Sequence, residues 1–114
     1  MKCAWTCLVE YPFTDGTGSK VRPVLVVSRD AFNRGDDVIV VPISSQPGES
    51  DPYSIYVRDD SPHFPASGLK FSSAIKWGKP FTISKVLLIR RLGTLDDSIM
   101  SQVSAEIRSL FTEP

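Results

Sequence analysis

Apolar residues recur along the chain in short runs rich in valine and isoleucine, and polar segments carrying Gly, Pro, Asn and Asp separate these runs. Such runs are typical of β-strands, and the separating residue types favour turns. The segments that we expect to be strands are Cys3–Glu10, Val21–Ser28, Asp37–Ile43, Tyr53–Val57, Ser73–Trp77 and Thr82–Ile89. The chain is therefore predicted to be mainly β.

The hydrophobic period changes near the end of the chain, where apolar residues recur at helical spacing. Thr94 is the expected N-cap, and the carboxylates of Asp96 and Asp97 complement the positive end of the helix dipole. The apolar stripe consists of Ile99, Val103, Ile107 and Leu110, with Phe111 beside them. We expect this C-terminal helix to pack with its stripe against the sheet.

Length and composition predict one compact domain over residues 1–114, because 114 residues with 41% hydrophobic content suffice for one core. No apolar run approaches the roughly 20 residues that span a bilayer, and the first residues are too polar for a secretory signal. We therefore expect a cytoplasmic protein with no membrane partner. The sequence contains no P-loop, dinucleotide-binding or zinc-protease motif.

Cysteine and histidine give little support for metal or histidine chemistry. Cys3 and Cys7 stand four residues apart with no further ligand to complete a metal set, so we expect no metal and read both as buried thiols on one face of a strand. His63 is the only histidine, which excludes a ribonuclease mechanism that needs two. We expect His63 to be a structural or surface residue in a loop.

Charge is balanced overall but unevenly distributed. The net charge is zero, yet residues 35–60 hold six acids and one base, whereas residues 68–93 hold six bases and no acid. A block of charge +6 creates a positive field that attracts a polyanion or an acidic protein segment. The alternative is a solvated lysine-rich strand face.

A Gly-rich polar loop ends at Arg22-Pro23 and leads directly into an apolar strand. An arginine guanidinium keeps its charge and presents a planar fork of donors that suits phosphate. Pro23 fixes its own φ and biases Arg22 toward extended geometry. The junction therefore predicts an anion site at the start of a strand, with an ordinary solvated arginine as the alternative.

Four blocks of the sequence resemble, in order and spacing, the PemK/MazF family of type II toxin–antitoxin toxins: YPFTDGTGSKVRPVLVVS, DVIVVPISSQ, GLKFSSAIKWGKPFTISK and RRLGTLDDSIMSQVSAEIRSLF. The resemblance implies a small SH3-like β-barrel with a C-terminal α-helix, usually a homodimer, and a cognate antitoxin as partner. It implies a sequence-specific endoribonuclease (mRNA interferase) that cleaves single-stranded RNA without metal or other cofactor. The substrate's 2′-hydroxyl would attack, leaving a 2′,3′-cyclic phosphate and a 5′-hydroxyl.

The resemblance assigns roles to individual residues. Arg22 matches the arginine of the family's RP motif, and Ser44 falls where a threonine is usual, so these two are the expected catalytic residues. Both can donate hydrogen bonds to a phosphate as negative charge builds on it. The expected RNA-binding residues are Gln46, Lys20, Lys76, Phe13, Asp15 and Ser45.

The chain departs from the family pattern at three places. Ala4-Trp5 stands where many members have Gly-Asp, and Gly78 and Phe81 stand where some branches have an acid and a downstream arginine. Trp77 offers a ring for base stacking, although a core or interface position is commoner for tryptophan. Two alternative functions stay open: a gyrase-targeting toxin on the same fold, and a catalytically silent barrel that binds RNA or protein.

Overall fold

One antiparallel sheet and one long helix make up most of the chain in the computed structural model, which describes residues 1–11, 20–45 and 51–112. The strands are β1 Trp5–Tyr11, β2 Lys20–Val26, β3 Asp37–Ser44, β4 Ile55–Val57, β5 Ser73–Ile75, β6 Phe81–Ser84 and β7 Leu88–Thr94. The helices are α1 Asp30–Asn33 and α2 Asp97–Ser109, with 3-10 turns η1 Pro65–Ser67 and η2 Lys85–Leu87. Within the described residues, no helix is long and apolar enough to cross a membrane.

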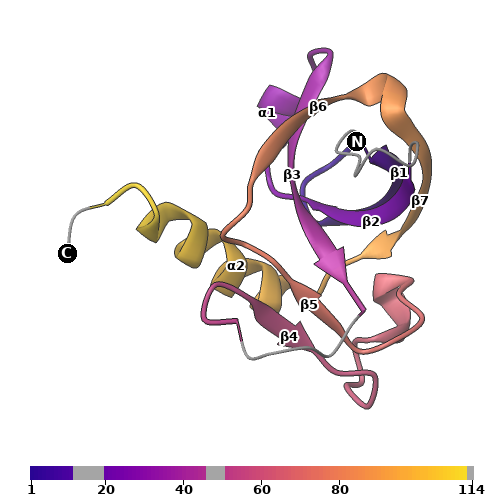
Figure 1. Cartoon of the computed structure of the whole chain (residues 1–114), viewed down its shortest axis with the longest axis vertical. Helices are drawn as coiled ribbons and strands as arrows, with labels where there is room; N and C mark the ends of the chain where they lie inside the picture. Colours follow the sequence, from indigo (N-terminus) through magenta and orange to yellow (C-terminus); the bar gives the residue numbers. More distant parts are fainter. Residues whose placement is uncertain (12–19, 46–50, 113–114) are drawn as a thin grey trace.

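The sheet has the order β4-β5-β3-β2-β1-β7, and β6 also pairs with β3. The long strand β3 pairs with β6 along its first half and with β5 at its end. Figure 1 shows β1, β2, β3, β6 and β7 curling around one another, with β4 and β5 extending to one side. In the described part of the chain, no strand pairs β7 with the far edge, so the sheet curls without closing. The predicted class, mainly β with a C-terminal helix, is confirmed.

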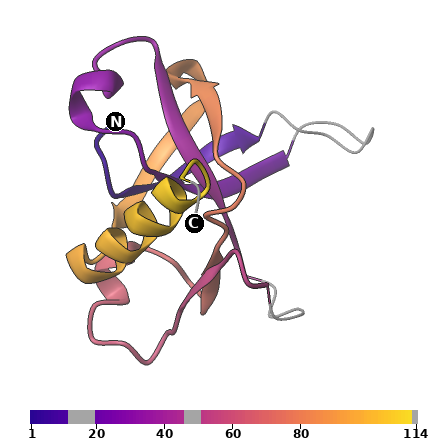
Figure 2. The same ribbon diagram turned by 90° about the vertical axis from the view of Figure 1, so that its left-hand side faces the viewer.

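Both faces of the sheet are buried along Val24–Val26 of β2 and along most of β3, which gives the molecule two hydrophobic clusters. Because successive strand side chains point to opposite faces, Val24 and Val26 enter one cluster and Leu25 enters the other. The cluster that contains Val24 and Val26 is called the inner cluster, and it also contains Cys7, Val9, Val38, Val40 and Ile83. The cluster that contains Leu25 is called the outer cluster, and it also holds Val41, Ile43, Ile75, Trp77, Met100 and Val103. Figure 2 shows α2 lying over the face of the sheet that carries this cluster.

Trp77 is part of the outer cluster and is only 5% exposed. Its ring meets the edge of the Tyr53 ring at a centroid distance of 5.4 Å. The indole is therefore a core residue, and base stacking, which needs an open ring face, is not its role.

Three expected boundaries were wrong. The predicted strand over Thr82–Ile89 is split by η2, where the Ser84 hydroxyl accepts the backbone N–H of Val86 at 3.3 Å. Thr94 is not the N-cap of the helix, because its pairing with Trp5 keeps it extended as the last residue of β7. The strand predicted over Cys3–Glu10 begins only at Trp5. Residues Asp30–Asn33, which lie between two predicted strands, make the single helical turn α1.

The two cysteines do not share a strand, because Cys3 precedes β1. Cys7 is fully buried in the inner cluster, and Cys3 is half-buried. Burial raises the pKa of the Cys7 thiol to about 11 and also raises the pKa of Cys3. Both groups are therefore protonated and poorly reactive at neutral pH.

The chain bends sharply at Ala4, which adopts φ of 71°, in the left-handed region that favours glycine. Its N–H donates to the Val26 carbonyl at 2.9 Å, and its own carbonyl accepts the Leu95 N–H at 2.8 Å. These bonds tie the bend to the end of β2 and to the segment before α2. A glycine would adopt this backbone conformation with less strain than the alanine present.

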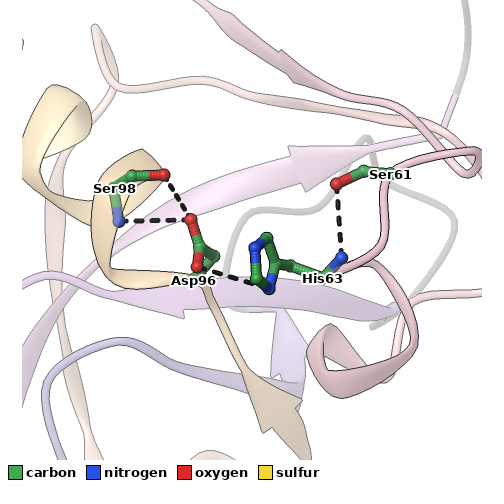
Figure 3. Close-up of polar contacts among 4 residues, drawn as sticks. All are labelled: Ser61, His63, Asp96 and Ser98. Carbon is green, nitrogen blue, oxygen red and sulfur yellow. Dashed lines mark hydrogen bonds and ion pairs between the residues drawn. The ribbon is translucent and has the colours of Figure 1, made fainter.

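Asp96 is the N-cap of α2, and its carboxylate also contacts His63 in the loop between β4 and η1 (Figure 3). Its carboxylate accepts hydrogen bonds from the Ser98 N–H, at 3.2 Å, and from the Ser98 hydroxyl. His63 Nδ1 lies 3.6 Å from the other carboxylate oxygen. The Ser98 hydrogen bond, with a smaller contribution from His63, lowers the pKa of Asp96 below its usual 3.8.

Replacing Asp96 with alanine is expected to lower the Tm by a few degrees at pH 7, because the first turn of α2 loses its side-chain acceptor. A carboxylate whose pKa is depressed on folding stabilises the fold above its unfolded pKa, and this contribution disappears as the pH falls through the folded pKa. The Tm difference between wild type and Asp96→Ala should therefore shrink toward zero in acid, as measured by circular dichroism. Asp97→Ala, in the same turn, is the control; an Asp96→Ala Tm equal to that of Asp97→Ala would refute the assignment.

Candidate functional site

Arg22 and Ser44 are brought to the same face of the sheet where the β2–β3 ladder ends. The last paired residues at this end are Val24 and Pro42. Each strand continues for at least two more residues, and alternation places Arg22 on the face of Val24 and Ser44 on the face of Pro42. Continuing the register by two residues sets Arg22 opposite Ser44.

An open cleft of about 600 Å³ lies at this strand end. It is lined by Lys20, Val21, Arg22, Pro23, Ile43, Ser44 and Ser45. Four of the residues expected from the sequence therefore share one cleft: Arg22, Ser44, Lys20 and Ser45. The Arg22 and Ser45 side chains are exposed, and those of Lys20 and Ser44 are half-buried.

The guanidinium of Arg22 lies over an aromatic ring. Its Cζ is 5.5 Å from the centroid of Tyr11, within the range of a cation–π contact. Tyr11 is in turn met edge-on by Phe81, with ring centroids 5.6 Å apart and planes at 84°. Neither ring was expected at the site from the sequence, where Phe81 appeared only as a departure from the family pattern. The sequence signal that could have found Tyr11 is strand alternation. Val9 pairs with Arg22, and Tyr11, two residues further along β1, lies on the same face and diagonally opposite Arg22.

Lys76 lies outside the cleft lining. Its N–H donates to the Pro42 carbonyl at 3.0 Å, which fixes its backbone beside β3. Hydrogen bonds from the Tyr53 N–H and the Ser54 hydroxyl lower the pKa of Asp51, and Lys76 adds a smaller electrostatic contribution. Lys76 is therefore next to β3 in the fold but is not part of the cleft lining.

Three residues expected to bind RNA, Phe13, Asp15 and Gln46, lie outside the described residues. Phe13 and Asp15 belong to the segment between β1 and β2. Gln46 follows Ser45, which lines the cleft. Their role stays a prediction from the sequence.

Two neighbouring grooves share lining residues with the cleft. One, of about 390 Å³, shares Pro23 and Ser45 with the cleft and adds Lys70, Arg90 and the exposed ring of Phe71. The other, of about 270 Å³, shares Ser44 and adds Tyr56, Arg58 and Ser72. Cations therefore lie in both grooves that share lining residues with the cleft: Lys70 and Arg90 in one and Arg58 in the other.

The basic block of the sequence does not form one continuous patch. Lys70 and Arg90 line the groove beside the cleft. Lys76 and Lys79 make small electrostatic contributions to the lowered pKa of Asp51. Arg91 stacks on Trp5, with Cζ 4.4 Å from the ring centroid. Part of the block is thus available to an anionic ligand, and part serves contacts within the protein.

Among residues 1–11, 20–45 and 51–112, no group of three or more His, Cys, Asp or Glu side chains is arranged to hold a metal ion. The chemistry that the described cleft offers comes from a guanidinium, an ammonium and hydroxyl groups. These groups bind phosphate oxygens and stabilise negative charge as it develops on them. The arrangement suits a phosphodiester better than an uncharged substrate.

Several solved structures share this fold. An endoribonuclease from a mycobacterial species, solved in complex with its cognate antitoxin, is 18% identical with a TM-score of 0.73, covering 100% of this chain and 97% of the other. The Mycobacterium tuberculosis toxin MazF-mt6 is 20% identical with a TM-score of 0.72, covering 96% of this chain and 99% of the other. MazF in a MazE–MazF complex from Deinococcus radiodurans is 17% identical with a TM-score of 0.75, covering 97% and 95%.

Identities this low show the fold alone, and a search of curated protein sequences finds no match. The family evidence comes from the sequence pattern. Residues 5–111 match the family described as PemK-like, MazF-like toxin of type II toxin–antitoxin system. This match covers nearly the whole chain, including every strand and the helix α2. The chain therefore belongs to the PemK/MazF family of toxins of type II toxin–antitoxin systems.

Proposed function

We propose that this protein is a metal-independent endoribonuclease that cleaves single-stranded RNA in the cleft between the ends of β2 and β3. Toxins of this family are generally endoribonucleases. The proposal is supported by the fact that Arg22 and Ser44 line the same cleft, which is open enough for a nucleotide.

In the proposed reaction the 2′-hydroxyl of the RNA attacks the adjacent phosphorus. The P–O2′ bond forms, the P–O5′ bond breaks, and the products are a 2′,3′-cyclic phosphate and a 5′-hydroxyl. The proton of the 2′-hydroxyl leaves to solvent, and the departing 5′-oxygen takes a proton from solvent. Because the nucleophile belongs to the substrate, the protein need not generate one from water or metal.

Arg22 and Ser44 would act on the phosphate oxygens. The guanidinium donates two hydrogen bonds in one plane, and the serine hydroxyl donates a third. Charge on these oxygens increases in the pentavalent transition state, so preorganised donors lower its energy more than that of bound RNA. A guanidinium is a poor general base, since it holds its proton throughout the physiological range. We therefore assign Arg22 an electrostatic role.

The flanking nucleotides would follow the grooves that adjoin the cleft. Lys20 and Ser45 lie within the cleft, and Lys70 and Arg90 offer cations along its extension. Gln46, Phe13, Asp15 and Lys76 remain proposed RNA contacts from the family resemblance. Phosphate contacts of this kind give affinity, and the segments holding Phe13, Asp15 and Gln46 would select the bases.

We also propose that the protein is a cytoplasmic homodimer neutralised by a cognate antitoxin, as in the antitoxin complexes of its structural neighbours. An acidic segment that folds on binding would suit the basic groove beside the cleft. Exposed apolar side chains near the edge strand β7, Val86 at 86% and Ile89 at 50%, offer a surface that a second copy would cover.

The test is incubation of purified protein with a mixed-sequence single-stranded RNA in EDTA. Cleavage to fragments ending in 2′,3′-cyclic phosphate and 5′-hydroxyl, identified by end-specific labelling and mass spectrometry, is the expected result. RNA bound without cleavage would identify a catalytically silent barrel. Inhibition of gyrase without cleavage would identify a gyrase-targeting toxin.

A further inference from the structure

We propose that Tyr11, supported by Phe81, is a positioning residue that holds the Arg22 guanidinium in the orientation needed at the scissile phosphate. This inference rests on the function proposed above and adds to it the device that orders the cation. Three strands contribute: Tyr11 ends β1, Arg22 lies in β2, and Phe81 begins β6. The three side chains form a continuous stack that runs from the inner cluster to the cleft.

The base of the stack is anchored in the sheet. Phe81 pairs in register with Val40, which is fully buried, and its half-buried ring packs against the inner cluster. Its ring meets the Tyr11 ring at 5.6 Å and 84°, the edge-to-face arrangement that aromatic pairs prefer. Tyr11 is thus held from below by a ring that cannot move without disturbing the core.

The Tyr11 ring determines where the Arg22 guanidinium lies. The guanidinium carbon is 5.5 Å from the Tyr11 centroid, and the Arg22 side chain is exposed. An exposed arginine otherwise samples many rotamers, and only a fraction of them would point at a phosphate. A cation–π contact restricts this sampling without requiring the guanidinium N–H groups as hydrogen-bond donors. The donors therefore stay available to the substrate.

The same stack bears on the departures from the family pattern. Phe81 stands where some branches carry an arginine, and Gly78 where they carry an acid. Charged neighbours in a site both orient an arginine and compensate its charge. In this chain the aromatic stack would take over the orienting part without adding a charge of its own.

The decisive measurement in the free protein is the NMR resonance of the Arg22 Nε–Hε group. A proton held over an aromatic ring is displaced by the ring current. Tyr11→Leu is expected to remove that displacement, Phe81→Leu to reduce it, and Tyr11→Phe to preserve it. An Arg22 resonance unchanged by Tyr11→Leu would overturn the proposal, whether or not the protein cleaves RNA.

The kinetic arm separates positioning from direct contact with RNA. Tyr11→Leu should lower kcat about 3- to 30-fold, the range expected for loss of a cation–π contact, with KM nearly unchanged. Tyr11→Phe should restore the wild-type kcat. Tyr53→Leu serves as the control, because it removes a tyrosine ring that also packs edge to face against an aromatic but lies outside the lining of the cleft; this ring is 56% exposed, more than the half-buried Tyr11.

A double-mutant cycle completes the test. If Tyr11 acts through Arg22, then Tyr11→Leu has no further effect on single-turnover cleavage once Arg22 is alanine. An equal loss in both backgrounds, or a loss expressed as a higher KM, would show that Tyr11 contacts the RNA itself and would overturn the inference. Absence of cleavage by the wild type, with the Arg22 resonance responding to Tyr11→Leu, would overturn the proposed function while leaving the stack established.

Discussion

Replacing Arg22 with alanine should lower the rate constant for RNA cleavage about 10²- to 10³-fold, the loss typical of removing one preorganised donor from a developing oxyanion. Arg22 is the guanidinium in the cleft that Ser44 lines, and the remaining donors there are a lysine and hydroxyl groups. The measurement is single-turnover cleavage of an end-labelled RNA in EDTA. Because the side chain is exposed, the Tm should change little.

Two further variants make the result specific. Arg22→Lys retains the charge but loses the planar pair of donors, so its activity should fall between those of wild type and Arg22→Ala. Arg34→Ala removes an exposed arginine after α1, away from the cleft, and should cleave at the wild-type rate. Full activity in Arg22→Ala would sink the assignment of this cleft as the catalytic site.

The largest effect on stability is expected from Gly68→Ala, which should lower the free energy of unfolding by at least about 3 kcal/mol. Gly68 has φ of 71°, where an L side chain is strained. A Cβ at this position would lie 2.0 Å from the carbonyl oxygen of Leu92, in the backbone of β7. Neither partner can retreat easily, because β7 is paired with β1.

Urea unfolding followed by circular dichroism measures this loss. Gly35→Ala is the matched control: its new Cβ would meet only a backbone oxygen at 3.6 Å, an ordinary contact, so the change should stay within about 1 kcal/mol. A Gly68→Ala protein as stable as Gly35→Ala would mean that the η1 turn does not pack on β7 as described.

The strands and the long helix could be predicted from local pattern because their interiors repeat with a period of two or of nearly four residues. The boundaries that failed depend on partners distant in sequence. Thr94 has the chemistry of an N-cap, but pairing with Trp5 keeps it extended, and Asp96 caps the helix instead. The residues around Thr94 carry no information about where β1 lies, so a local pattern could not predict this pairing.

The site divides in the same way. The combination of Arg22 with Ser44 was expected only through family order, and in the structure both residues line one cleft beyond the end of the β2–β3 ladder. The contribution of Tyr11 and Phe81 was not foreseen, because a ring's role under a guanidinium depends on three strands meeting. Lys76 was expected to bind RNA because it aligns with a basic position of the family; it lies outside the lining of the cleft, and its contact with RNA stays a prediction.

Burial of both faces of β2 and β3 has a consequence for how such a toxin diverges. Between Val24 and Val26, and between Val38 and Ile43, nearly every side chain is enclosed, so substitution there is constrained from two sides. The residues that line the cleft lie just beyond these stretches and are mostly exposed or half-buried. Substitutions at the strand ends can therefore reshape the cleft with little effect on folding, so the part of the molecule that is free to vary is the part that would meet a ligand.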